Sequence, residues 1–148
     1  TAGVPFEVVP GVSSAIAVPA YAGIPVTHRG VAASFAVLTG HEDPSKRGDA
    51  IDWARLATAV DTLVVLMAVG TFPRIVGARL ADGRHPETPV ALLRWATTEA
   101  QEVRVGTLAD IVGRARGLEP PVVAVIGEVV RLRARLDWAV EGAAVRAL

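Results

Sequence analysis

The residues best placed to do chemistry lie near the start of the chain, in the stretch VVPGVSSAIAVPAYAGIPVTHR from Val8 to Arg29. Ser13 or Ser14 is a sound N-cap for a helix that reaches about Ala22. The first N–H groups of such a helix have no partner within it, and small side chains around them would let a polar ligand approach closely. Ordinary capping and close helix–sheet packing explain the same residues, so the pattern alone leaves both interpretations open.

Three clusters of charged residues follow the small-residue helix of this stretch. His28 and Arg29, at the end of the stretch, could hold an anionic ligand, or could form a solvated loop with a salt bridge. The sequence His41-Glu42-Asp43 lacks a further His or Cys at ligand spacing, so it predicts a polar turn and no metal site. Arginines at 131, 133 and 135 alternate with apolar residues, a pattern that predicts an edge strand or an extended tail.

Composition excludes several classes of protein. The chain has 148 residues, 51% of them hydrophobic, which suits one globular domain. Fifteen basic and fifteen acidic residues balance, so we expect no nucleic-acid partner. No apolar run approaches the ~20 residues that a membrane span needs. The absence of cysteine removes disulfides and thiolate metal sites, and suits a cytoplasmic protein. The opening TAGVPFEVVPG, without methionine, predicts a segment of a longer protein.

Apolar runs alternate with amphipathic segments along the rest of the chain. We expect a helix over about 50–60, capped by Asp49, a second helix opened by Gly70 and Thr71, and a third capped by Thr107. Buried strands are predicted at Ala33–Thr39, Thr62–Met67, Pro89–Trp95, Gln101–Gly106 and Pro121–Ile126. Only Ala96–Ala100 separate the third strand from the fourth, too few residues for a crossover, so these two form a hairpin. The pattern predicts a mixed, mostly parallel five-stranded sheet flanked by helices.

The same stretches resemble one known family. VVPGVSSAIAVPAYAGIPVTHRG is similar to the signature of the tetrapyrrole methylases, and similarity continues through FAVLTGHEDP (35–44), IDWARL (51–56) and LVVLMAV (63–69). It resumes with PVALLRWATTEAQEVRVGTL (89–108) and PVVAVIGEVVRLRARLDW (121–138). The resemblance covers nearly the whole chain, and best fits members that methylate uroporphyrinogen III.

The resemblance implies a fold, a reaction and a cofactor. Family members have two α/β domains with S-adenosylmethionine between them, and residues 1–148 resemble the C-terminal domain, so an N-terminal domain is missing from this chain. Uroporphyrinogen III is methylated at two carbons to precorrin-2, for sirohaem and cobalamin. Members are commonly homodimers. The residues that the family uses for proton transfer lie in the missing part, so we expect no catalytic residue here.

The resemblance also assigns binding residues. Ser13 and Ser14 match positions that contact the cofactor through backbone and hydroxyl, and Met67 matches a methionine that flanks the adenosyl group. Ala96 stands where many members have the glycine of an E-N-G turn, which reads R-W-A here. Val122 matches a small apolar residue at the adenine. For the eight carboxylates of the substrate, the best candidates are the basic side chains already noted at 28 and 29.

Two other readings stay open at this point. The chain could be a non-enzymatic ligand-binding or oligomerisation domain with this fold. It could also belong to a related methylase that acts on a later corrinoid precursor or on RNA.

Overall fold

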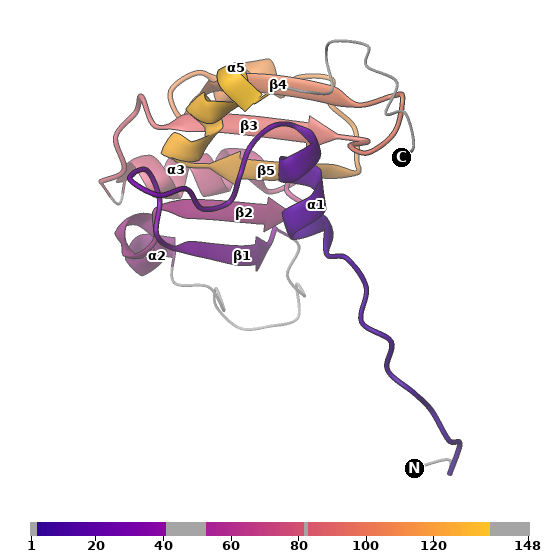
Figure 1. Ribbon diagram of the computed structural model, residues 1–148. Helices are drawn as coiled ribbons and strands as arrows, with labels where there is room; N and C mark the ends of the chain where they lie inside the picture. The colour runs from indigo at the N-terminus through magenta and orange to yellow at the C-terminus, as the bar shows by residue number, and fades with distance from the viewer. Residues whose placement is uncertain (1–2, 41–52, 82, 137–148) are drawn as a thin grey trace.

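The computed structural model describes residues 3–40, 53–81 and 83–136 (Figure 1). The elements in chain order are α1 (Ser14–Tyr21), β1 (Phe35–Thr39), α2 (Trp53–Ala59), β2 (Thr62–Leu66), α3 (Phe72–Ala81), β3 (Pro89–Arg94), β4 (Glu102–Thr107), α4 (Ile111–Arg114), β5 (Val122–Ile126), the 3-10 helix η1 (Glu128–Leu132) and α5 (Arg133–Leu136). All five predicted strands are confirmed to within two residues at each end. The predicted loop over 40–49 and its helix cap at Asp49 fall almost wholly outside the described residues.

The five strands form one mixed sheet in the order β1-β2-β5-β3-β4. The hairpin of β3 and β4 is confirmed as an antiparallel pair. The expectation of a mostly parallel sheet was wrong, because only β1 and β2 pair in parallel, and β5 runs antiparallel to both of its neighbours. The hairpin reverses the chain, so the strand after α4 enters the centre of the sheet in the opposite direction. A central strand is apolar on both faces whichever way it runs, so its sequence does not report its direction.

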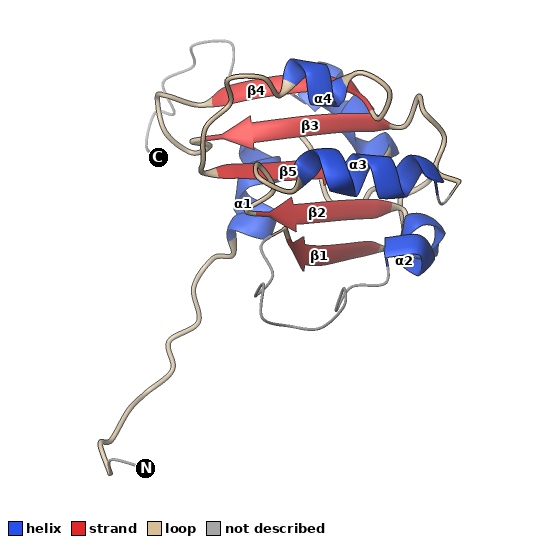
Figure 2. Ribbon diagram, turned by 180° about the vertical axis from the view of Figure 1, so that it is seen from behind, coloured by secondary structure: helices blue, strands red, loops and turns tan. Residues whose placement is uncertain are grey.

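Helices cover both faces of the sheet. The segment from α1 through residue 34 crosses one face together with η1 and α5, and α3 and α4 cover the other (Figures 1 and 2). Alternate residues of each strand therefore enter different cores. In β2, Leu63 and Val65 pack with the α3 side, whereas Val64 packs beneath α1. Within the described residues no helix is long and apolar enough to cross a membrane.

Two local predictions at the C-terminal half were wrong. Thr107 does not cap a helix: it ends β4, where it pairs with Pro89, and the helix begins only at Ile111. The N–H of Thr107 donates to the Asp110 carboxylate at 2.8 Å across the intervening turn. The arginine-rich stretch is helical, not extended. Arg131 pairs with Glu128 three residues earlier at 2.9 Å, a spacing that a helical turn brings together and a strand does not.

The sheet has two distinct ends, which we name by the strands that run in the same direction. Its carboxyl end is where β1, β2 and β3 finish and β5 begins. Its amino end is where β1, β2 and β3 begin and β5 finishes. Residues 3–13 extend away from the body at the carboxyl end (Figure 1). Apolar side chains of this segment are exposed, namely Val4, Phe6, Val8, Val9 and Val12.

Candidate functional site

A crevice of about 610 Å3 opens at the carboxyl end of the sheet. Its walls come from the start of α1, the loop after β2, the turn after β3 and the two prolines before β5. The lining residues are Ser14, Val18, Leu66, Met67, Val69, Gly70, Leu93, Trp95, Ala96, Pro120, Pro121, Val122 and Val123. None of them carries a charged side chain. The crevice therefore suits an uncharged, largely apolar group, and its size is ordinary for a small-molecule site.

Four of the five predicted cofactor positions meet in this crevice. Ser14, Met67, Ala96 and Val122 all line it, although more than eighty residues separate the first from the third along the chain. Ser13 does not line it. Instead, the Ser13 hydroxyl accepts a hydrogen bond from the N–H of Ala15 at 3.2 Å and caps α1. Capping therefore accounts for one of the two serines, and the other faces the crevice. Whether these residues contact a cofactor stays a prediction.

The backbone at the crevice is strained. In the described part of the chain, the non-glycine residues with positive φ are Met67 (53°), Trp95 (50°) and Thr97 (71°). Two of these line the crevice and the third follows Ala96. Left-handed backbone at a residue with a side chain costs on the order of 1–3 kcal/mol and clusters at functional sites. The sequence carried no sign of this strain, because nothing in a residue's identity marks a left-handed methionine or tryptophan.

The loop that contains Met67 is held in place by Gly40, the residue that follows β1. The N–H of Gly40 donates to the Leu66 carbonyl at 2.6 Å, and the hydroxyl of Thr71 donates to the Gly40 carbonyl at 2.6 Å. A Cβ at Gly40 would lie 2.9 Å from the Met67 carbonyl oxygen, closer than side chains tolerate. Glycine at this position lets the two chain segments touch, and the contact fixes the path of the loop after β2.

The turn after β3 is tied by its own side chains. The Thr98 hydroxyl donates to the Trp95 carbonyl at 2.7 Å, and the N–H of Thr97 donates to the Gln101 side chain at 3.2 Å. These bonds hold Trp95 and Ala96 at the crevice in one conformation. Sequence reasoning singled out Ala96 and missed Trp95, Pro120 and Pro121, because it carried over only positions with a known family contact.

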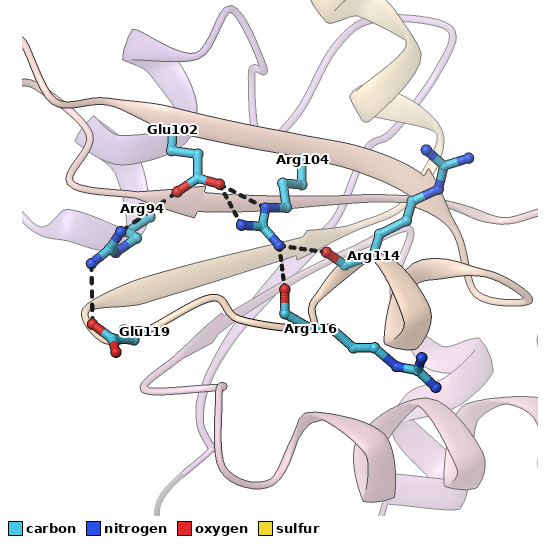
Figure 3. Close-up of polar contacts among 6 residues, drawn as sticks. All are labelled: Arg94, Glu102, Arg104, Arg114, Arg116 and Glu119. Atoms are coloured by element: carbon cyan, nitrogen blue, oxygen red, sulfur yellow. Dashed lines mark hydrogen bonds and ion pairs between the residues drawn. The ribbon is translucent and has the colours of Figure 1, made fainter.

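A network of arginines and glutamates supports this turn from the α4 side of the sheet (Figure 3). Glu102 lies between Arg94, at 3.6 Å, and Arg104, at 2.6 Å. The Arg104 guanidinium lowers the pKa of the Glu102 carboxyl, with a smaller contribution from Arg94. Arg104 also donates to the carbonyls of Arg114 and Arg116, at 2.7 and 2.8 Å, where α4 ends. The hairpin, the end of α4 and the crevice wall are thereby held together.

His28 and Arg29 do not join the crevice. They form an exposed turn in which the N–H of His28 donates to the Ala32 carbonyl at 2.9 Å. This turn leads into the amino end of the sheet, where the Asp61 carboxylate accepts bonds from Ala33 and Ser34. Figure 1 shows the chain crossing the sheet between α1 and β1 to reach that end. A substrate contact at these two residues stays a prediction, without support from the crevice geometry.

No metal centre is present among the residues that the structure describes, where no three His, Asp or Glu side chains group together. The sequence His41-Glu42-Asp43 lies outside them, so its interpretation as a polar turn is untested. Nor does the crevice contain a side chain able to donate or accept a proton near neutral pH.

Relatives of the chain are methyltransferases. It is 48% identical over 129 residues to an S-adenosyl-L-methionine-dependent uroporphyrinogen III methyltransferase of Methanosarcina barkeri, covering 86% of this chain and 51% of that protein. It is also 48% identical to a uroporphyrinogen-III C-methyltransferase of Methanocaldococcus jannaschii, covering 87% of this chain and 54% of the relative. A siroheme synthase of Tolumonas auensis is 45% identical, and the match covers 92% of this chain and 29% of the synthase. The chain thus spans about half the length of the first two relatives.

Solved structures agree with this assignment. A uroporphyrin-III C-methyl transferase from Thermus thermophilus, complexed with S-adenyl homocysteine, superposes with a TM-score of 0.74 at 36% identity. The match covers 88% of this chain and 56% of the Thermus protein. The profile of the Tetrapyrrole (Corrin/Porphyrin) Methylases matches residues 1–112. A family match over three quarters of the chain, together with relatives 45–48% identical and a solved structure of the same fold, shows that this chain belongs to the tetrapyrrole methylase family.

Proposed function

We propose that this chain forms one wall of the S-adenosylmethionine cleft of a uroporphyrinogen-III C-methyltransferase, an enzyme that makes precorrin-2 for sirohaem and cobalamin. One observation carries the proposal: Ser14, Met67, Ala96 and Val122 come from four separate segments and line one uncharged crevice. The Thermus structure with S-adenyl homocysteine supports the cofactor, and the names of the relatives support the substrate.

The crevice fits the nucleoside part of this cofactor. An adenine needs an apolar slot and a few polar groups, which the Val122 and Met67 walls and the Ser14 hydroxyl would supply. Methionine is polarizable and adapts its shape to a ring. Its 61% exposure shows that the side chain is not used to fill the core. This exposure supports a ligand contact for Met67 over a role in packing the core of this domain.

The chemistry asks little of these side chains. When bound, the sulfonium of the cofactor supplies a methyl group that an electron-rich pyrrole carbon can accept. The residues of this chain would hold the adenosyl end in place and exclude water from it. Rate would then come from alignment of donor and acceptor, the effect that makes positioned reactions fast.

The substrate and the second wall are expected outside this crevice. A macrocycle with eight carboxylates needs basic partners, and the lining provides none. The exposed apolar residues of the segment 3–13 support a further domain that packs against this segment, because a row of apolar side chains is unfavourable in water. A homodimer, which the family resemblance implies, is part of the same proposal.

The proposal is tested by comparing the chain alone with the chain completed. By itself, the 148-residue chain should bind S-adenosylmethionine weakly and transfer no methyl group. Joined at Thr1 to the part of the Methanosarcina relative that precedes the matching segment, it should add two methyl groups to uroporphyrinogen III, as seen by mass spectrometry. Ala96→Trp, which fills the crevice, should abolish transfer in the joined protein, whereas Thr58→Trp on the exposed side of α2 should not.

Two results would contradict the proposal. Tight calorimetric binding or methyl transfer by the chain alone would show that no second wall is needed. A folded joined protein that binds the cofactor without methylating uroporphyrinogen III would favour a non-enzymatic domain, or a methylase for another substrate.

A further inference from the structure

We propose that Trp95 is the surface on which the purine base of the cofactor stacks, and thus a residue that selects an adenosyl ligand. The inference rests on the proposed function, because it names the contact that this crevice makes with the ligand. No family contact assigned by resemblance falls on this position.

Trp95 is displayed rather than buried. It is 48% exposed and lines the crevice, with a left-handed backbone and a carbonyl tied to the Thr98 hydroxyl. Exposing half of an indole forgoes much of the stabilisation that burying such a large apolar surface would bring. A strained backbone and an unburied ring at one residue both lower stability. A ligand that covers the ring would recover part of that loss.

The ring is also held in place by a cation. The Arg94 guanidinium carbon lies 5.9 Å from the centre of the indole ring, within the range of a cation–π contact. Arg94 shares its face of β3 with Leu92, whose side chain packs on the α3 side. Glu102 and Glu119 anchor it there, at 3.6 and 3.7 Å (Figure 3). The contact with Arg94 therefore favours one orientation of the Trp95 ring beside the crevice.

The chemistry of the crevice selects the base rather than the other parts of the ligands. The homocysteine end carries ionised groups, and the macrocycle carries many carboxylates, yet no lining residue is charged. A purine is flat and uncharged, and its π face suits an indole. Stacking of a base on an aromatic side chain is worth roughly 1–3 kcal/mol, and about 1.4 kcal/mol, in the lower half of that range, corresponds to a tenfold change in affinity.

Nuclear magnetic resonance on the 148-residue chain can test this even at millimolar affinity. Met67 is the single methionine of the chain, so its labelled methyl group reports occupancy of the crevice without ambiguity. Trp95 is one of three tryptophans, and its indole N–H signal is assigned by its loss in Trp95→Phe. Adenosine and S-adenosylhomocysteine should shift both signals. Homocysteine, which lacks the base, should leave the Trp95 signal unmoved.

Two variants measure the contact directly. Trp95→Ala should weaken S-adenosylhomocysteine binding about tenfold, and Trp95→Phe, which keeps a ring, should weaken it less. Unchanged amide signals from the central strands β2 and β5 would confirm that each variant is folded. If the Met67 methyl shifts with ligand, while Trp95 does not and Trp95→Ala binds normally, the stacking inference is overturned and the crevice assignment stands. If neither signal moves with any adenosyl ligand, both proposals fail.

Discussion

At the amino end of the sheet polar groups are paired across loops, whereas at the carboxyl end apolar side chains are left facing solvent. At the amino end, Arg84 donates to the main-chain carbonyls of Val60 and Asp61, at 3.2 and 2.8 Å. The Asp61 carboxylate meanwhile accepts from the N–H and hydroxyl of Ser34. At the carboxyl end, Met67 and Trp95 are exposed on left-handed backbone. Side-chain hydrogen bonds to neighbouring loops therefore mark one end, and exposed apolar side chains on left-handed backbone mark the other.

The hydrogen bonds of the amino end contribute to stability, whereas the exposed and strained residues of the carboxyl end are suited to binding a ligand. Residues that lower stability persist when a function uses them, and strained, solvent-facing groups are typical of ligand sites. If this contrast holds, added bulk at the amino end should lower stability, and relief of backbone strain at the carboxyl end should raise it.

The largest effect is expected from Gly127→Ala at the amino end. Gly127 has φ 146°, and an added Cβ would lie 2.6 Å from the Asp61 carbonyl oxygen. Strain and the forced shift should together lower the free energy of unfolding by about 3 kcal/mol, measured by urea denaturation. Gly77→Ala is the control. Gly77 lies in α3 with open space around it, so its substitution should raise stability by about 0.5–1 kcal/mol. An equal loss of stability in both variants would show that the close contact at Gly127 is not the cause of the destabilisation.

The next effect, of opposite sign, is expected from Met67→Gly at the carboxyl end. Glycine adopts positive φ without strain, and the exposed side chain contributes little packing, so stability should rise by about 1 kcal/mol. Met67→Ala keeps the strain and should not gain. If alanine proved more stabilising than glycine in urea denaturation, the left-handed backbone would not be a source of strain.

A smaller effect is expected from acid at the amino end. Hydrogen bonds from the Ala33 N–H, then from Ser34, hold the pKa of the Asp61 carboxyl below its ordinary value of 3.8. Its stabilisation is therefore present above about pH 4 and is lost as pH falls through the lowered value. In Asp61→Asn, the urea midpoint of unfolding should therefore depend less on pH over this range. The remaining slope would come from Glu102 and Asp110, whose pKa values are also lowered. A slope unchanged by the substitution would show that the carboxylate does not fasten this end.

The smallest effect is expected from Arg29→Ala. Because Arg29 lies in the turn that leads to the amino end, its removal should leave the response of the Met67 methyl signal to S-adenosylhomocysteine unchanged. Val122→Trp, which fills the crevice, should abolish that response and serves as the positive control. A weakened response in Arg29→Ala would mean that the two ends act together in binding.

Much of the fold could be predicted from the chain because its signals are local. Continuous apolar runs marked all five strands, and five residues between the third and fourth required a hairpin. The direction of β5 could not be predicted, since a strand with neighbours on both sides is apolar on both faces. The helix expected at Thr107 begins only at Ile111, because Thr107 is still paired with Pro89 in the sheet, and residue type does not report such a pairing.

The candidate site, like the fold, could be predicted only in part from the sequence. Family resemblance indicated Ser14, Met67, Ala96 and Val122, and the structure brings them to one crevice. It separates from them His28 and Arg29, which are close to Ser14 in the chain and lie toward the other end of the sheet. Trp95 was missed because its exposure and its backbone conformation depend on the turn that contains it.

The amino-acid sequence by itself determined the strands, a helix cap at Ser13 or Ser14 and the family, because these depend on residue type and short-range spacing. Only the tertiary structure decided the strand order, the open crevice and which side chains face it. Those features depend on contacts between residues far apart in the chain, where packing and backbone strain outweigh local preference.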